Sequence, residues 1–431
     1  MRQSMYPRMY QQMLEQMMAA GMPEAVAAKQ AEAAANKAVE TAISGVSMEA
    51  EMAVPESFRT PTMNLALFHE SNLLLTDRLK LTLGLRLNLD RVKIEYDALA
   101  YMNMTGGTAE RQATYHLTSH VVDSRSKTYT QLLPKVGFTY NLGENLGNVY
   151  ALVSKGYRAG GYNIQMFSDV LQTELNAHQQ DAMRGDYDVE HTAQDYDNIE
   201  QTISYKPEES WNFELGTHLN LFGGSTHFDA ALYYMQIRNQ QLSIMEPNSN
   251  YGRMMVNAGK SHSCGIEATL RGRLLDNALD WGLTYGFTSA KFDEYEHTNL
   301  TGWTPSSPSD DSYLGMSRDY NDNYVPFVPQ HTLSAMADYR LTRRLTLGAN
   351  LSAQGKTYWD EANTYAQKFY AVLGAHADYD FGSVVVSLWG RNLTNSRYNT
   401  FAIQSSAADG TRFFAQRANP IQFGLDVNIH F

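Results

Sequence analysis

Two histidines and two acidic pairs are the side chains whose chemistry is easiest to name. His116 and His120 are spaced so that both rings can lie on one face of a strand, as a metal site would require. Nothing nearby in the sequence supplies further ligands, so a solvated pair of loop histidines is the simpler interpretation. The carboxylates of Asp186–Asp188 and Asp195–Asp197 could collect Ca²⁺ or divalent ions that bridge lipopolysaccharide. The simpler alternative is an extracellular loop kept soluble by its charge.

A methionine stripe and an adhesion-like tripeptide complete this set. Methionines recur at every fourth position from Met1 to Met17, which would stack them on one face of a helix interrupted at Pro7. Thioethers can bind Cu(I), but such a stripe is usually packing. Arg184-Gly185-Asp186 spells an adhesion tripeptide that a chain of this length can contain by chance. Because no cluster of serine, histidine and carboxylate marks a catalytic site, the sequence predicts no enzyme.

Most of the chain is expected to form strands, and the last strand shows their alternation of apolar and polar residues most clearly. Side chains of a strand point to opposite faces with period two, so unbroken alternation gives one apolar and one polar face. About ten such residues, tilted, cross a bilayer as one strand of a barrel. The apolar residues expected to insert this closing strand into the membrane are Phe423, Leu425, Val427, Ile429 and Phe431.

Leucine alternation in an earlier segment supports the same fold class. Leucines occupy every second position from Leu79 to Leu89, between charged and polar residues from Lys80 to Asp90. Such a strand needs a solvent that accepts leucine on one face and a wet space on the other. Related patterns recur at 211–219, 279–287, 333–339 and 345–351. The sequence therefore predicts an all-β protein, a transmembrane antiparallel meander β-barrel, rather than a soluble sandwich.

Short turns and long loops alternate along the chain from residue 61 onward. Gly-, Asn- and Asp-containing turns are expected at 76–77, 143–147, 223–224, 276–277, 342–343 and 381–382. Long polar loops are expected at 96–127, 157–208, 239–260, 292–330, 356–367 and 393–414. Outer-membrane barrels sort their connections in this way, with short periplasmic turns and long extracellular loops.

Residues 1–60 differ from the rest in being rich in Met and Ala. The segment from Pro23 to Ala42 predicts a helix that starts at proline and ends before Gly45. We expect 1–60 to be a helical loop insert, the remnant of an extracellular loop, and 61–431 to be the C-terminal transmembrane β-barrel region. The first residues lack the charged and apolar regions of a signal peptide. Since an outer-membrane protein must be exported, we expect that a signal peptide has been removed or that the chain is incomplete.

The predicted hairpins and the terminal strand give about thirteen strands. The first, 63–75, runs toward a short turn, whereas single-chain bacterial barrels have an even number of strands and both ends in the periplasm. The odd count therefore predicts that strands are missing on the N-terminal side.

Charge and cysteine content exclude several classes of protein. The 34 Lys and Arg residues against 46 Asp and Glu leave a net charge of -12, which argues against a nucleic-acid partner. Cys264 is the only cysteine, so neither an internal disulfide nor a cysteine-built metal site is possible. The mean hydropathy is -0.41. Barrel strands escape hydropathy averaging, and the 27 Tyr and 17 Phe suit aromatic girdles.

Four segments together resemble the C-terminal part of a TonB-dependent outer-membrane receptor. Asn257 to Glu267 resembles the "NAG…GxE" strand of that family, and Val325 to Thr332 resembles its "P…P.HT" segment. Trp389 to Tyr398 resembles the "NL(F/T)(D/N)…Y" segment, and Gln416 to Phe431 resembles the closing strand with its terminal Phe. The resemblance covers most of 63–431.

This resemblance implies a 22-stranded barrel with a plugged lumen, in which the strands seen here would be the tenth to the last. It implies the outer membrane of a Gram-negative bacterium as location. The partners that it implies are outer-membrane lipid, the barrel-assembly machinery, and the TonB energy-transducing complex, which would act through a plug region missing from this chain. No nucleic acid and no cofactor are expected.

Aromatic residues in the long loops are the best candidates for contacts with a ligand. Rings at such places can stack on a ferric chelate, a cobalamin-like ring or a sugar, or they can pack the loops against one another. The candidates are Tyr162, Phe167, Trp303, Tyr313, Tyr358 and Trp359.

Uptake of a scarce ligand with TonB-derived energy is the leading hypothesis, and a ferric siderophore or other iron complex is the ligand that the resemblance favours. A passive porin-like channel is one alternative, but the odd strand count speaks against it. A surface barrel that binds or adheres to a partner is another alternative.

Overall fold

The computed structural model describes residues 2–43, 46–108, 111–143, 145–245, 253–295, 320–407 and 410–430. The chain divides into two compact units. Unit 1 comprises Met1–Ser57, Tyr96–Asp123 and Val170–Tyr196, and unit 2 comprises Phe58–Glu95, Ser124–Asp169 and Asp197–Phe431. Among the described residues, no helix is both long and apolar enough to cross a membrane.

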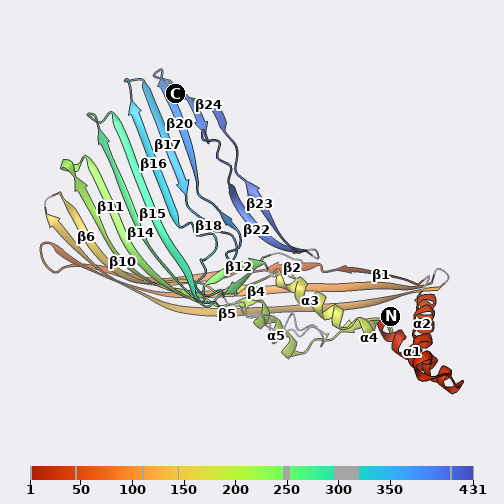
Figure 1. Cartoon of the computed structure of the whole chain (residues 1–431). Helices are drawn as coiled ribbons and strands as arrows, with labels where there is room; N and C mark the ends of the chain where they lie inside the picture. The colour runs from red at the N-terminus through yellow and green to blue at the C-terminus, as the bar shows by residue number, and fades with distance from the viewer. Residues whose placement is uncertain are drawn as a thin grey trace. The chain divides into compact units, whose positions relative to one another are not determined.

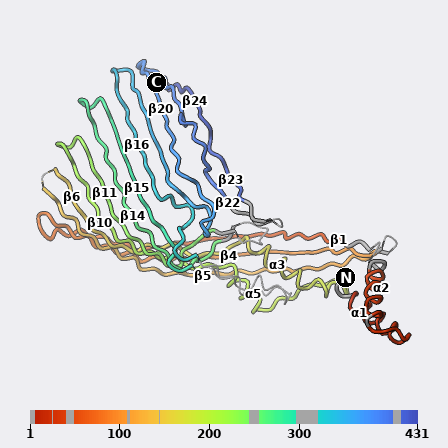
Figure 2. Tube along the Cα trace, viewed as in Figure 1, coloured from red at the N-terminus to blue at the C-terminus, as the bar shows by residue number. Residues whose placement is uncertain are grey.

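One antiparallel sheet forms most of unit 2, and its long strands pair in the order in which they occur in the chain (Figures 1 and 2). Short turns at the six predicted places join strands of this sheet into hairpins. Among the described residues this sheet has 16 strands, three more than the predicted thirteen. The thirteen that correspond to predicted strands are β3 (Thr62–Leu74), β4 (Leu79–Thr108), β5 (Arg111–Gly143), β6 (Gly147–Arg158), β10 (Glu208–Leu221), β11 (Thr226–Arg238), β14 (Lys260–Leu274), β15 (Leu279–Glu294), β16 (His331–Arg340), β17 (Leu345–Gln354), β20 (Tyr370–Asp380), β21 (Val384–Arg391) and β24 (Gln422–Ile429).

Short elements fill the longer connections. Small two-stranded sheets join β7 (Gly161–Tyr162) to β9 (Ser204–Tyr205), β12 (Gln241–Met245) to β13 (Arg253–Asn257), β18 (Thr357–Tyr358) to β19 (Ala366–Gln367), and β22 (Asn399–Ala407) to β23 (Gly410–Arg417). The connection between β7 and β9 also contains β8 (Tyr187–Val189), α3 (Met166–Ala177), α4 (Gln179–Ala182) and α5 (Ala193–Ile203), whereas η1 (Phe222–Gly224) forms the short turn between β10 and β11.

Large apolar side chains lie exposed on one face of the sheet. On β24, Leu425 is 61% exposed and Val427 is 53% exposed, and each pairs across the ladder with an apolar residue of β21. Phe423 and Ile429 are exposed on the same face, while Phe431 lies outside the described residues. Exposed apolar residues in cross-strand register are costly in water and suit a lipid solvent.

Unit 1 contains the N-terminal helices, α1 (Arg2–Ala19) and α2 (Glu24–Ile43). The helix predicted over 23–42 corresponds to α2, which starts just after Pro23. Its buried side chains Ala27, Ala31, Ala35 and Val39 recur at helical spacing, and small residues allow α1 to pack closely against them. The part of the predicted helical insert after α2 instead forms two strands, β1 (Val46–Ala53) and β2 (Glu56–Arg59).

The predicted polar loop over 96–127 is wrong, because β4 continues to Thr108 and β5 begins at Arg111. The extension keeps period two with small or flexible apolar residues: Tyr96, Ala98, Ala100, Met102 and Met104 are all buried. Alanine and methionine are weak strand signals, so the pattern is hard to see in the sequence. Residues 46–74 follow the edge of β4 as three strands, interrupted at Pro55 and Pro61, since proline has no N–H for the ladder.

Candidate functional site

The "NAG" segment anchors the connections at the loop end of unit 2. Asn257 accepts a hydrogen bond from the backbone N–H of Lys206 at 2.7 Å and donates to the carbonyls of Lys206 and Asn239 at 3.0 and 2.9 Å. Ala258 is fully buried, and Gly259 has a φ of 72°, which favours glycine. The motif therefore holds loop backbones in place and presents no free polar group of its own.

The "NL(F/T)(D/N)…Y" segment is also structural. Asn392 adopts a φ of 50°, which asparagine tolerates better than most residues. Its side chain accepts from the Ser396 N–H at 2.9 Å and donates to the Asn419 carbonyl at 3.0 Å. Tyr398 stacks on Tyr370 with ring centres 3.9 Å apart. These contacts connect the end of β21 to the approach to β24.

Tyr162 is the candidate ligand residue with the clearest unsatisfied polar atom. It lies in β7, and its buried hydroxyl has no hydrogen-bond partner within the described part of the chain. Burial raises the pKa of this phenol well above its usual value, so the group is a neutral donor. Because a buried unpaired hydroxyl costs free energy, a ligand acceptor that reached it would gain binding energy.

Cations surround Tyr162, but α5 largely neutralises them. The Lys127 ammonium lies 5.9 Å from the ring centre of Tyr162 and donates to the Ser204 hydroxyl at 2.7 Å. Glu200 lies 3.7 Å from Lys127 and 3.5 Å from Arg125, which also pairs with Asp197 at 2.9 Å. The positive charges of Lys127 and Arg125 near Tyr162 are thus nearly balanced by the carboxylates of Glu200 and Asp197.

The other predicted aromatic contacts fall into two groups. Phe167 is fully buried and packs on Phe58 with ring centres 5.0 Å apart, which favours the packing alternative for this residue. Tyr358 stacks on Tyr324 at 5.7 Å. Trp359 meets Phe327 edge-on at 5.5 Å, and its buried Nε1 has no hydrogen-bond partner among the described residues. Trp303 and Tyr313 lie outside the described residues.

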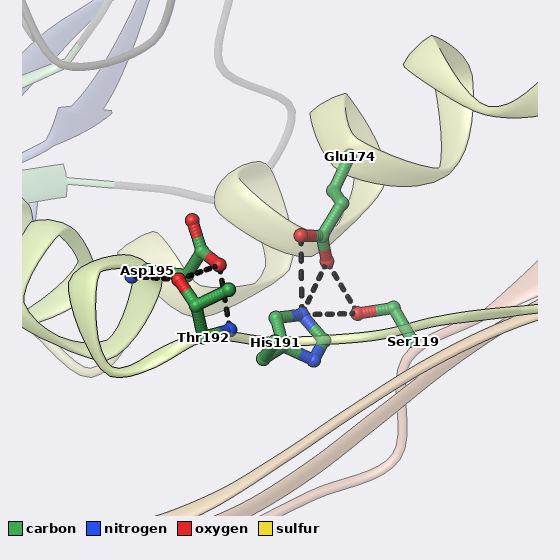
Figure 3. A network of polar contacts seen from close by, with 5 residues as sticks. All are labelled: Ser119, Glu174, His191, Thr192 and Asp195. Atoms are coloured by element: carbon green, nitrogen blue, oxygen red, sulfur yellow. Dashed lines mark hydrogen bonds and ion pairs between the residues drawn. The ribbon is translucent and has the colours of Figure 1, made fainter.

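A buried polar network in unit 1 was not foreseen from the sequence (Figure 3). His191 Nε2 lies 3.1 and 3.0 Å from the two carboxylate oxygens of Glu174, and the Ser119 hydroxyl donates to the same carboxylate. The hydrogen bond to Glu174 raises the pKa of His191. Nearby, Asp195 accepts from the Thr192 N–H at 2.7 Å, and its pKa is lowered mainly by the Thr192 hydroxyl.

This network contains the residue types of a hydrolase triad without its geometry. The same nitrogen, Nε2, faces both the Glu174 carboxylate and, at 3.4 Å, the Ser119 hydroxyl. A triad needs the acid on Nδ1 and the serine on Nε2, so that the imidazole can take the serine proton. The three residues instead connect β5, α3 and the segment after β8, and no feature of their spacing in the sequence predicted this.

The candidate metal ligands have protein partners. His116 Nδ1 lies 2.8 Å from the Asn103 side chain, and His120 Nε2 lies 2.8 Å from Asp97. Asp186 accepts from the His116 N–H at 3.0 Å, and Asp188 accepts from a threonine hydroxyl. Within the described ranges, no three His, Cys, Asp or Glu side chains are grouped so that they could hold a metal ion.

Comparison with known proteins agrees with the sheet and its motifs. A family model described as "TonB dependent receptor-like, beta-barrel" matches residues 40–393. The chain belongs to this family. The predicted resemblance is therefore confirmed, and so are the antiparallel β-barrel fold with its helical N-terminal segment and the outer-membrane location.

Curated relatives include two receptors. The probable TonB-dependent siderophore receptor PiuA of Acinetobacter baumannii is 30% identical over 206 residues, which cover 47% of this chain and 25% of the relative. The pesticin receptor of Yersinia pestis is 23% identical over 357 residues, which cover 81% of this chain and 42% of the relative. The matched part of the chain is thus less than half the length of each relative.

Solved structures share the fold. The ferric yersiniabactin uptake receptor FyuA from Yersinia pestis aligns with a TM-score of 0.54 at 19% identity, over 88% of this chain and 55% of that chain. The ferric-catecholate import receptor Fiu from E. coli aligns with a TM-score of 0.53 at 20% identity, over 87% of this chain and 45% of that chain. At this identity the likeness concerns the fold alone.

Proposed function

We propose that this chain forms part of an outer-membrane receptor that takes up a ferric siderophore or a similar iron complex with energy from TonB. The family match over residues 40–393 carries the proposal. It is supported by the relative from Acinetobacter baumannii, whose name is that of a TonB-dependent siderophore receptor. The barrel would also meet outer-membrane lipid and, during insertion, the barrel-assembly machinery.

Two buried donors at the loop end of unit 2 are the proposed ligand contacts. The Tyr162 hydroxyl and the Trp359 Nε1 are both without a hydrogen-bond partner within the described residues. Iron chelates present oxygen atoms that accept hydrogen bonds, and buried donors left unpaired in the free protein become satisfied on binding. The aromatic rings add contact area, since both are large and rigid. Phe167 is not part of this proposed set because it is fully buried.

Transport, not catalysis, is the activity that we propose. The Ser119–Glu174–His191 network is the constellation most like an active site in the described residues. Its geometry differs from that of a catalytic triad, because His191 uses the same nitrogen, Nε2, toward both Glu174 and Ser119. A passive channel is the alternative that the uptake experiment below would support if TonB proved unnecessary.

The experiment is uptake of radioactive iron by cells that carry the native gene product, with a panel of ferric siderophores. We expect uptake of at least one complex to disappear when either this protein or TonB is removed. Uptake that persists without TonB would overturn the proposal and support a passive channel.

A second measurement tests the proposed contacts. Tyr162→Phe removes only the hydroxyl, so we expect the affinity for that complex to fall about tenfold, the equivalent of one hydrogen bond of about 1.4 kcal/mol. The matched control is Tyr140→Phe, on a tyrosine that is 42% exposed on β5. Equal affinities for the two variants and the wild type would remove Tyr162 from the site.

A further inference from the structure

Two lysines and two tyrosines form a continuous row across neighbouring strands of unit 2. Lys291 on β15 pairs with Tyr324 through an isolated β-bridge, and its ammonium lies 5.0 Å from the ring centre of Tyr324. Tyr324 stacks on Tyr358 at 5.7 Å, and the Lys356 ammonium lies 4.2 Å from the ring centre of Tyr358. We name these four residues the Lys–Tyr row. Two ammonium groups thus stand at the ends of a stacked tyrosine pair.

The Lys–Tyr row continues the exposed apolar face of the sheet. Lys291 shares the alternation of Leu283 and Tyr285 on β15, which are 40% and 39% exposed. Residues paired across an antiparallel ladder point to the same face, so Tyr324 lies on it too. On the other side, Lys291 pairs with His262, whose ring lies 6.0 Å from that of Tyr234. An aromatic belt therefore runs along this face.

The row lies at the height of a membrane surface. From Leu279, beside a tight turn, to Lys291 the strand rises about 30 Å along the barrel axis, at about 3.4 Å per residue and a tilt of about 40°. The apolar band of an outer-membrane barrel is about 25 Å tall and is flanked by aromatic girdles. Since Lys291 is near the end that leads into a long loop, it reaches the extracellular interface.

The two ammonium groups lack acidic partners. Five other lysines of unit 2 lie within ion-pair distance of a carboxylate, namely Lys93, Lys127, Lys135, Lys155 and Lys260, whereas Lys80, Lys206 and Lys368 have no such carboxylate among the described residues. Within the described ranges, neither Lys291 nor Lys356 has one. Asp293, two residues beyond Lys291, is held by His262 at 2.6 Å. The two ammonium groups of the row are therefore not neutralised by an ion pair in the described residues, although the chain as a whole has a net charge of -12.

We propose that the Lys–Tyr row binds the phosphate-bearing headgroup of lipopolysaccharide in the outer leaflet. The Lys291 ammonium lies over the Tyr324 ring, and the Lys356 ammonium lies beside the Tyr358 ring and donates to its hydroxyl. Both ammonium groups can meet phosphate oxygens, and the tyrosine rings suit the interface between acyl chains and water. Lipid on this face is consistent with the exposed leucines below the row. The inference assigns Tyr358 to the membrane face and is independent of the transported ligand.

The test uses the full chain purified from outer membranes and titrated with lipopolysaccharide in mild detergent. We expect the double variant Lys291→Gln and Lys356→Gln to bind at least about tenfold more weakly than wild type, which is a loss of about 1.4 kcal/mol. Lys80→Gln, at the turn end of β4, is the matched control and should bind like wild type. Equal binding of all three proteins would overturn the proposal.

Competing anions separate lipid from free phosphate. Dephosphorylated lipopolysaccharide should bind wild type as weakly as the double variant does. Inorganic phosphate at millimolar concentration should not displace the lipid; full displacement would mean a general anion site and would overturn the lipid assignment. Heat-resistant migration of the double variant on gels checks that its barrel is folded.

The single cysteine gives a reading that does not depend on the lysines. Cys264 on β14 lies on the face of the aromatic belt, since it pairs with Tyr234. A spin label on Cys264 should collide with membrane-dissolved oxygen more often than with a water-soluble nickel chelate. The reverse preference would place the belt in water and overturn the proposal. This measurement needs neither lysine variant, so it does not depend on their folding.

Discussion

His191 illustrates how a single side chain can make the stability of one unit depend on pH. Its side chain is only 4% exposed, and that of Glu174 is 14% exposed, so solvent screens their interaction little. The carboxylate favours the charged imidazolium, which is why the pKa of His191 is raised. Asp195, which also favours the imidazolium, has a lowered pKa and stays ionised near neutral pH.

The sign of the pH effect follows from linkage. A group whose pKa is higher in the folded state stabilises that state fully below the unfolded value, about 6.5 for histidine, and the contribution is lost as pH rises through the folded pKa. We therefore expect unit 1 to become more sensitive to protease between α3 and α5 as pH rises from about 6 to about 8. The measurement is limited proteolysis of the protein in outer-membrane vesicles.

Two variants separate this histidine from general effects of pH. His191→Gln should abolish the pH dependence of cleavage, whereas His178→Gln, at a half-exposed histidine that pairs with Asp181, should keep it. An unchanged pH profile in His191→Gln would mean that other groups control the opening.

Asn257 carries a second prediction at the scale of one residue. Its amide makes three hydrogen bonds to the backbone of two loops, with distances between 2.7 and 3.0 Å. Asn257→Ala leaves the Lys206 N–H and two carbonyls without these partners, so we expect a loss of about 1 to 3 kcal/mol. The measurement is the thermal unfolding of the protein in detergent.

The control for Asn257 is Asn64→Ala, because Asn64 makes one exposed side-chain hydrogen bond, to Asp90. That variant should lose less than about 1 kcal/mol. If the two alanine variants unfolded at the same temperature, the hydrogen bonds of Asn257 would not stabilise the fold more than an exposed side-chain bond does.

At the scale of elements, the barrel strands were predictable within the bilayer, because apolar side chains facing lipid alternate there with polar ones. The strand predicted from Leu79 onward is β4, and the terminal alternation is β24. Beyond the apolar band the requirement disappears, and Ala98 or Ala100 can line a buried strand face as well as a loop. That is why the strand extensions and helices α3 and α5 were missed while the turns were found.

The lipid face of β24 can be tested by moving a charge between its two faces. Leu425→Lys or Val427→Lys places an ammonium on the exposed apolar face, at a cost of about 2 to 4 kcal/mol near mid-bilayer. We expect the amount of protein in the outer membrane to fall sharply. The matched control is Asn428→Lys on the opposite face of the same strand, which should insert at normal levels. Equal levels for all three variants would contradict the lipid assignment of this face.

At the scale of the whole molecule, fold and ligand differ in how far sequence determines them. Strand pairing repeats one physical rule along the chain, so many residues report it together. The proposed ligand contact at Tyr162 depends on one hydroxyl that has no hydrogen-bond partner among the described residues, and no pattern in the sequence encodes the arrangement of β7, α5 and β5 around it. For the same reason, Phe167 and Tyr162 look alike in the sequence but differ in burial.

The edges of the sheet give a prediction for the assembled protein. Within the described residues, β24 pairs only with β21, and β3 pairs only with β4. In the bilayer core an unpaired backbone N–H or C=O costs several kcal/mol, so neither edge can stay open there, whichever chain supplies the partner strand. We therefore expect the outward backbone amides of β3 and β24 to exchange hydrogen as slowly in native outer membranes as those of β16, which has a partner on each side. Hydrogen-exchange mass spectrometry on outer-membrane vesicles measures this directly, and the same sample in strong detergent gives the comparison. Fast exchange confined to β3 and β24 in native membranes would mean that the sheet is open there, and the transmembrane assignment of its edges would have to be abandoned.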